Sequence, residues 1–162
     1  MAPIDLLFDR LTNAGFEIQR NVDLAPYHLE LVAKKDTGKN PLARLIWFVV
    51  VSLADSADIS YLREYNMKVT EFVLDTLGSH KGRGAGAGVL SMPILMCKSP
   101  TDEAVEWVES NISPKHWAAF EFPVLVSLSS GQTSYCKKTP IWGAVYYRGF
   151  RKFVQEFVAN RS

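Results

Sequence analysis

The sequence predicts an α/β or α+β fold in which helices flank a mixed central sheet, in the order α-β-β-β-α-β-α-β-β-α. Three observations support this. The chain has 162 residues, about the length of one domain, and 48% of them are hydrophobic. Residues 45–51 are apolar on both faces, as in a central strand covered on both sides. Apolar residues recur at helical spacing before and after that run. Because neither a linker nor a repeat interrupts the chain, residues 1–162 are expected to form a single globular domain.

The N-terminal part predicts a helix followed by three strands. Apolar residues at positions i, i+3, i+4 and i+7 indicate an amphipathic helix, and they are Ile4, Leu7, Phe8 and Leu11. Gly15 is placed where such a helix stops. Two extended segments, 16–24 and 27–34, then follow on either side of Pro26, and the second alternates apolar with polar residues. The apolar run 45–51 is the third strand.

The next helix is expected to begin at Asp58 or Ser60, either of which can cap it, and to end at Gly78. The glycine-rich segment 82–88 comes directly after this helix. Phosphate-binding loops instead follow a strand and precede a helix, so that backbone N–H groups converge on the anion. The segment is therefore expected to be a connector or a loop that contacts a partner.

The C-terminal half predicts a strand, a helix and a hairpin. Residues 89–97 indicate another buried strand, although Pro93 cannot donate a hydrogen bond to a neighbouring strand. A capping serine, a proline and two acidic residues then predict a helix over 99–110, with Trp107 in the core. Residues 122–128 and 133–137 are expected to pair as a hairpin.

A last helix is expected to start near Thr139. Its apolar side chains fall on one arc of about 140°. These side chains are Tyr146, Tyr147, Phe150, Phe153, Val154, Phe157 and Val158. Arg148, Arg151 and Lys152 lie on the opposite side and are expected to be dispensable for folding.

Charge is distributed unevenly along a chain whose net charge is only +1. Residues 100–121 contain five acidic residues and one lysine, whereas residues 122–162 contain six basic residues and one glutamate. These segments are expected to be solvated faces whose charges partly compensate in the fold. The alternative is a local surface that binds a ligand or polyanion, and its residues would be Lys137, Lys138, Arg148, Arg151 and Lys152.

The expected location is the cytoplasm. The longest apolar run is far shorter than the ~20 residues that a membrane-spanning helix needs. Asp5 and Asp9 occupy the region where a signal peptide would carry positive charge. Two cysteines, Cys97 and Cys136, are too few for a disulfide framework.

Three residues are candidate catalytic groups: Glu30, Asp55 and Cys97. Glu30 and His28 are two residues apart on a predicted strand, so they share a face and could bind a metal ion. Asp55 follows the central strand at its carboxyl end, where open α/β sheets bind ligands. Cys97 comes just before a predicted helix N-terminus, which can lower the pKa of a thiol. Each candidate also has a structural alternative. His28 and Glu30 could simply lie on the solvent face of a strand, Asp55 could serve near a helix cap, and Cys97 could be a buried hydrophobic residue.

The order of helix, three strands, helix and strand over residues 4–97 resembles the core of the restriction-endonuclease-like superfamily. In that superfamily an acid on the second strand and a Glu-x-Lys-type pair on the third bind a metal ion and orient the attacking water. Glu30 stands where the first acid belongs. The third strand, 42–53, has Arg44 as its only charged residue and contains no acid-x-Lys sequence. The resemblance therefore implies a nuclease-like fold without the catalytic motif.

The sequence predicts a non-catalytic binding or scaffold domain, because no acid, base and nucleophile occur at a usable spacing. Its partner would be another protein or a second copy of the chain in a homodimer, and no cofactor is expected. The alternative is a metal-dependent nuclease or other phosphodiester enzyme, with Mg²⁺ or Mn²⁺ as cofactor and nucleic acid as partner. The candidate residues of that enzyme are Glu30, His28 and either Asp23 or Asp55.

Overall fold

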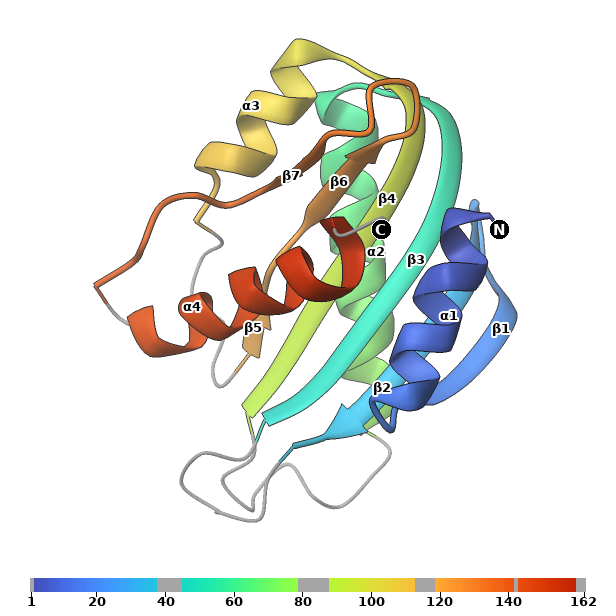
Figure 1. Cartoon of the computed structure of the whole chain (residues 1–162), viewed down its shortest axis with the longest axis vertical. Helices are drawn as coiled ribbons and strands as arrows, with labels where there is room; N and C mark the ends of the chain where they lie inside the picture. Colours follow the sequence, from blue (N-terminus) through green and yellow to red (C-terminus); the bar gives the residue numbers. More distant parts are fainter. Residues whose placement is uncertain (1, 38–44, 79–87, 113–118, 142, 160–162) are drawn as a thin grey trace.

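The computed structural model describes residues 2–37, 45–78, 88–112, 119–141 and 143–159. Its elements follow the predicted order, with one additional short strand and a final turn of π-helix. The prediction of an α/β fold around a mixed sheet is therefore confirmed (Figure 1). Most of the predicted glycine-rich loop, residues 82–87, lies outside the described residues.

A seven-stranded mixed sheet forms the centre of the fold. Its strands are β1 (Glu17–Leu24), β2 (Tyr27–Asp36), β3 (Leu45–Ala57), β4 (Gly88–Pro100), β5 (Ala119–Glu121), β6 (Val124–Ser127) and β7 (Thr133–Tyr135). The strand order is β1-β2-β3-β4-β6-β7, and β5 also pairs with β4. β4 runs parallel to β3, β5 and β6. The other neighbouring strands are antiparallel.

Helices cover both faces of this sheet. α1 (Pro3–Asn13) and α4 (Ala144–Phe153) pack on one face, and α4 continues into a π-helical turn, Val154–Ala159. α2 (Ile59–Gly78) and α3 (Asp102–Ser110) pack on the other face. Within the described ranges, no helix combines the length and hydrophobicity needed to cross a bilayer.

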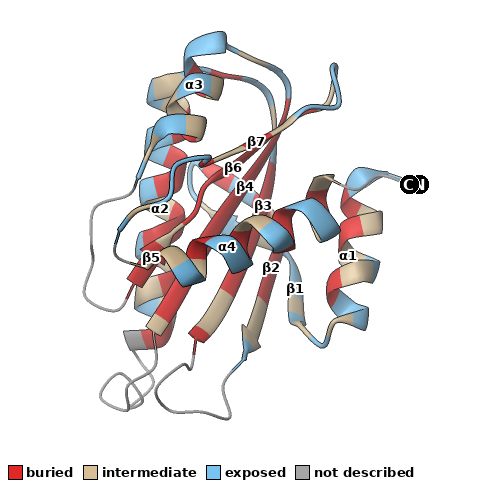
Figure 2. Cartoon of the chain, turned by 60° about the vertical axis from the view of Figure 1, so that its left-hand side comes forward, coloured by how far each residue is buried: buried red, intermediate tan, exposed pale blue. Residues whose placement is uncertain are grey.

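The central position predicted for residues 45–51 is confirmed. Val49 and Val51 of β3 belong to the core layer beneath α1 and α4, whereas Phe48 and Val50 belong to the layer beneath α2 and α3. Residues 48–52 of β3 and residues 89–97 of β4 are all buried (Figure 2). Side chains of both pleat faces are therefore removed from water, which explains why the run lacks an alternating pattern.

β4 is a central strand, with β3 on one side and β5 and β6 on the other, although it contains Pro93. Val50 is the register partner of Pro93 on β3. The buried hydroxyl of Tyr65, on α2, reaches the carbonyl oxygens of Val50 at 3.4 Å and Ile94 at 3.3 Å. A side-chain hydroxyl thus donates to strand carbonyls close to the position where proline has no N–H to donate.

The predicted apolar arc of the last helix is confirmed. Its buried members are Tyr147, Phe150, Phe153, Val154 and Val158, and the other two, Tyr146 and Phe157, are partly buried. Phe150 is 1% exposed, and its ring lies 5.5 Å from the ring of Trp47 and 5.5 Å from that of Phe122. The helix therefore packs along its length through a layer of aromatic rings.

Several helix boundaries differ from the prediction. α3 is capped by Thr101, whose hydroxyl accepts a hydrogen bond from the Ala104 N–H at 3.2 Å, and not by Ser99. The reason is that β4 stays paired with β3 as far as Pro100, so Ser99 belongs to the strand. α4 begins at Ala144, later than predicted. The three-residue strand β5 was not predicted.

Candidate functional site

Asp55 lies at the carboxyl end of β3, as predicted, but its carboxylate faces solvent and pairs with a lysine. Lys98, on the neighbouring strand β4, places its Nζ 2.8 Å from Asp55 Oδ1. The hydrogen bond and the positive charge of Lys98 hold the pKa of Asp55 below its ordinary value. Asp55 therefore acts as a partner of Lys98, and its side chain makes no contact with Glu30 among the contacts of the described residues.

A pH titration followed by NMR tests this pair. We expect Lys98→Ala to raise the pKa of Asp55 toward its ordinary value, because the variant removes the cation that stabilises the carboxylate. A carboxyl pKa that is lowered in the folded state contributes stability above the ordinary pKa and loses it as the pH falls. Lys152→Ala, on α4, is the control. An Asp55 titration midpoint that is the same in wild type and Lys98→Ala would contradict the pairing.

Cys97 is buried within β4 and offers no accessible thiol. Its Sγ lies 3.6 Å from the Asp55 carbonyl oxygen, and desolvation raises the pKa of the thiol. This direction is opposite to the one that an activating helix N-terminus would produce. Cys136 is also buried, and burial raises its thiol pKa as well.

Thiol labelling should reflect this burial. We expect a disulfide reagent such as dithionitrobenzoate to react slowly with the native protein at pH 8 and rapidly with both thiols after denaturation, because only the exposed thiolate reacts. Cys97→Ala and Cys136→Ala assign any residual reactivity. Fast stoichiometric labelling of native Cys97 would restore it as a candidate nucleophile.

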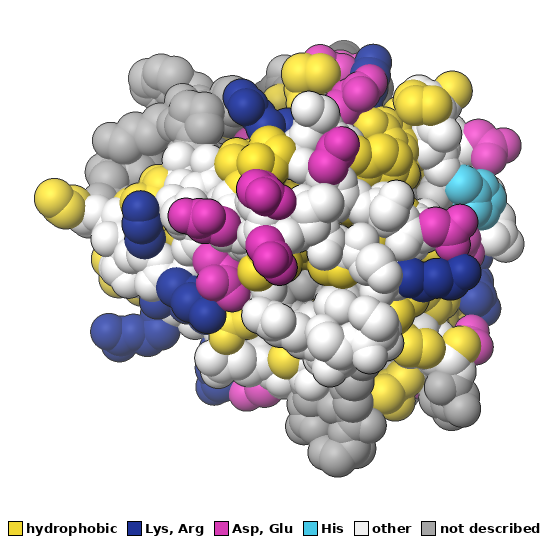
Figure 3. Space-filling model, turned by 90° about the horizontal axis from the view of Figure 1, so that it is seen from above, with side chains coloured by type: hydrophobic (Ala, Val, Ile, Leu, Met, Phe, Trp, Pro, Cys, Tyr) yellow, Lys and Arg dark blue, Asp and Glu magenta, His cyan; other side chains and the backbone are white. Residues whose placement is uncertain are grey.

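The structure brings His28 and Glu30 together and adds Asp23 of β1. His28 Nδ1 lies 3.1 Å from Asp23 Oδ1, and His28 Nε2 lies 3.9 Å from Glu30 Oε1. The amide oxygen of Asn21 lies 3.4 Å from the same Nε2, and Asn21 has a φ of 56°, which is unusual for a residue other than glycine. The side chain of His28 is half exposed, and histidine is coloured cyan in Figure 3.

This polar cluster does not have the arrangement of a metal site. In the ranges that the structure describes, no three His, Cys, Asp or Glu side chains are placed so that they could hold a metal ion. The imidazole of His28 instead lies between side-chain oxygens on both of its ring nitrogens. Metal binding by His28 and Glu30 therefore stays a prediction.

The basic residues of the C-terminal region are largely engaged within the fold. Lys137 Nζ lies 3.1 Å from Glu109 Oε1 of α3, so the acidic and basic segments partly compensate each other, as expected. Arg151 is partly buried, and its Nη2 donates to the carbonyl oxygen of Lys138 at 3.0 Å and to Thr139 Oγ1 at 2.9 Å. Arg151 therefore ties α4 to the preceding segment, whereas the sequence indicated a residue facing only solvent.

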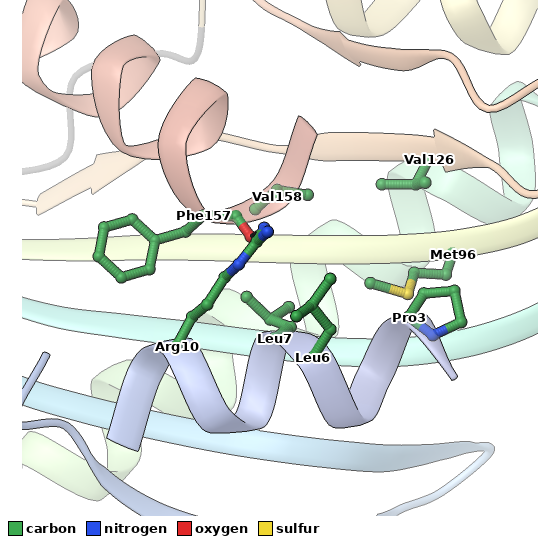
Figure 4. A pocket seen from close by; sticks show the side chains of 8 residues that line it. All are labelled: Pro3, Leu6, Leu7, Arg10, Met96, Val126, Phe157 and Val158. Atoms are coloured by element: carbon green, nitrogen blue, oxygen red, sulfur yellow. Dashed lines mark hydrogen bonds between the residues drawn. The ribbon is translucent and has the colours of Figure 1, made fainter. Parts of the chain in front are cut away.

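A small apolar pocket of about 150 Å³ lies between α1 and the π-helical turn (Figure 4). Its walls include Leu7, Met96 and Val158. Arg10 reaches across from α1, and its Nη1 donates to the carbonyl oxygen of Phe157 at 3.0 Å. Apart from the Arg10 guanidinium, which is hydrogen-bonded to a backbone carbonyl, the lining of this pocket is apolar. Such a lining favours hydrophobic packing over catalysis.

A larger groove of about 620 Å³ lies between α2 and the C-terminal end of α3, and β5 contributes to its edge. Three apolar side chains line it, namely Met67, Leu74 and Trp107. Met67 is 52% exposed and is one of the large hydrophobic side chains that the structure leaves at the surface. Trp107 was expected in the core, but the structure leaves it partly exposed beside the groove.

Two buried polar side chains of α2 also line this groove. Thr70 is 6% exposed, and its hydroxyl lies 3.0 Å from the hydroxyl of Ser91 on β4. Asn66 is 5% exposed, but its Oδ1 has no hydrogen-bond partner among the described residues. Because nearly all buried polar atoms in folded proteins have a partner, the Asn66 amide is the exceptional group of this surface.

The charged residues around the groove are mainly acidic. They are Arg63, Glu64, Glu71 and Glu121. The first three are exposed residues of α2, and within the described part of the chain no ion pair engages Glu64 or Glu71. The groove thus combines an apolar wall, a buried amide whose oxygen lacks a partner among the described residues, and the exposed carboxylates of Glu64 and Glu71.

Comparison with known proteins gives a weak result. No protein-family model matches the chain, and no curated protein matches it. Among solved structures, EndoMS in its apo form is similar with a TM-score of 0.31 and 14% sequence identity. The matched region covers 65% of this chain and 41% of the EndoMS chain, so this chain spans less than half of that protein. The comparison therefore shows a weak structural resemblance to EndoMS and does not show that the chain shares its fold.

Proposed function

We propose that this protein is a non-catalytic binding domain that holds a segment of a partner protein in the groove between α2 and α3. The observation that carries the proposal is the unpaired Oδ1 of the buried Asn66. A buried polar atom without a hydrogen bond costs about 1–3 kcal/mol. A bound partner that donates a hydrogen bond to this oxygen would remove that cost, so the unpaired amide is accounted for by binding.

The surroundings of Asn66 support the same function. Binding sites are mostly apolar and contain a few polar groups that fix the orientation of the ligand. Met67 and Trp107 provide the apolar surface here, and Asn66 provides the polar group. Methionine is a flexible side chain that adapts to different partners, and exposed methionines are common on binding surfaces.

A peptide screen by thermal shift tests the proposal, because a ligand that binds only the folded state raises the melting temperature. Met67→Trp places a bulky ring on the groove wall, and Asp75→Trp places the same ring at an exposed position of α2 outside the groove. We expect peptides that stabilise the wild type and Asp75→Trp but not Met67→Trp. If no peptide distinguishes the two variants, the groove is not the binding site.

The groove does not favour a symmetric homodimer. In a two-fold interface each surface meets its own copy, so the carboxylates of Glu64, Glu71 and Glu121 would be buried against a second surface in which Arg63 is the one cation among the described lining residues. Size-exclusion chromatography with light scattering measures the oligomeric state. A dimer that persists in Met67→Trp would form through a different surface.

A metal-dependent nuclease or other phosphodiester enzyme is the second candidate function. The observation behind it is the proximity of Asp23, His28 and Glu30, whose side chains would have to rearrange to hold a metal ion together. The test is cleavage of plasmid DNA and of RNA in the presence of Mg²⁺ or Mn²⁺. Cleavage that Glu30→Ala abolishes would support this function over the binding domain, and cleavage that Glu30→Ala leaves unchanged would exclude this cluster.

A further inference from the structure

We infer that the segment bound between α2 and α3 is basic and extended, with lysine or arginine side chains in the groove; this rests on the function proposed above. The first observation is charge. Among the described residues that line the groove, Glu64, Glu71 and Glu121 outnumber the one cation, Arg63. Glu64 and Glu71 are exposed and no ion pair of the described residues engages them, so they attract a cationic ligand and repel a polyanion. Nucleic acid is therefore a poor occupant.

The second observation is the combination of carboxylates with an aromatic ring and a thioether. The ammonium or guanidinium group of a basic side chain is attracted to the face of an indole, such as that of Trp107. The methylene stem of lysine or arginine packs on apolar surface while the charged head remains hydrated. Met67 and Leu74 offer that surface next to the glutamates of the same helix.

The third observation is the unpaired amide of Asn66. An asparagine oxygen accepts hydrogen bonds, and the backbone N–H of a bound peptide is a suitable donor. The groove follows α2 from Arg63 to Leu74, a helix length of about 17 Å at 1.5 Å per residue. About five residues of extended chain cover the same length. A peptide of this length would place one N–H near Asn66 and its basic side chains near Glu64 and Glu71.

The basic region of a second copy is a weaker occupant than a foreign segment. Lys137 is paired with Glu109, and Lys152 lies 3.9 Å from Glu156. Arg151 is bonded to the backbone and side chain of the segment before α4. These side chains are already used within one chain, and Arg151 and Lys152 are carried by the folded helix α4 rather than by an extended segment.

A charge exchange at Met67 tests the inference. Met67→Lys and Met67→Glu both remove the thioether from an exposed position, so the difference between them reports the charge of the occupant. The probes are three seven-residue peptides that alternate leucine with lysine, glutamate or serine, and affinity is measured by titration calorimetry at low salt. We expect Met67→Glu to bind the lysine peptide roughly fivefold or more tightly than Met67→Lys does, with the difference shrinking as salt is added.

The matched control is Asp75→Lys with Asp75→Glu, at an exposed site on α2 outside the groove. The affinities of these two variants for the lysine peptide should differ by less than those of the two variants at position 67. Thermal unfolding should show that all four variants are folded. Equal affinity of Met67→Lys and Met67→Glu for the lysine peptide overturns a basic occupant. If the glutamate or serine peptide binds the wild type and loses affinity in Met67→Trp, the groove remains a binding site and only its basic occupant is wrong. If none of the three peptides shows binding that Met67→Trp weakens, the proposed function fails as well.

Discussion

Replacing Phe150 with alanine is expected to lower the free energy of unfolding by about 3–5 kcal/mol, which is the usual cost of removing a fully buried phenylalanine. The ring is 1% exposed and lies within 5.6 Å of the rings of Trp47, Phe120 and Tyr147, measured between ring centroids. Its removal would open a cavity bordered by several elements, which cannot all move to fill it. In a chain of this size the melting temperature should fall by about 10 °C.

Val145→Ala on the same helix is the control, because Val145 is 84% exposed and should change stability very little. Chemical denaturation of both variants measures the two free energies. A loss of less than about 1 kcal/mol in Phe150→Ala would mean that α4 is not packed against the sheet. The same result would contradict the aromatic layer that joins the last helix to β3 and β5.

The parts of the fold that were predicted correctly are those that a local pattern determines. The apolar run in β3 is buried by both helical layers, and the apolar arc of α4 faces the sheet. The boundary errors arise where pairing between distant segments decides the outcome. Ser99 has the features of a helix cap, but parallel pairing with β3 keeps it in β4, and the cap moves to Thr101.

In the candidate sites, too, local patterns predicted only the contacts between residues that are close in the sequence. His28 and Glu30 come together because both lie on β2, so their spacing in the sequence was sufficient to predict their proximity. The groove is formed by helices that are about 40 residues apart in the chain, and no local pattern connects them. One signal was present: Asn66 and Thr70 follow Leu62 at intervals of four residues, so two polar residues occupy the buried stripe of α2.

Asn66→Leu is expected to stabilise the free protein by about 1–2 kcal/mol, in contrast to most substitutions at buried positions. The leucine would remove an oxygen that is buried without a partner, and it has a higher helix propensity than asparagine. Its extra volume can extend into the groove that Asn66 lines. The same change should weaken the binding of any segment that donates a hydrogen bond to Asn66, as expected when a polar group is retained for function at the expense of stability.

Thr70→Val provides the matched contrast one helical turn away. Its hydroxyl is bonded to Ser91 at 3.0 Å, so the valine would leave the buried Ser91 hydroxyl without this partner and should destabilise the protein by about 1–3 kcal/mol. The two substitutions both remove a buried polar side chain from α2, yet they should change the free energy of unfolding in opposite directions. Equilibrium denaturation of the wild type and both variants measures these changes in the free energy of unfolding. If Asn66→Leu destabilises the protein as much as Thr70→Val does, the Asn66 amide is already satisfied in the free protein, and the groove loses the observation that most strongly marks it as a binding site.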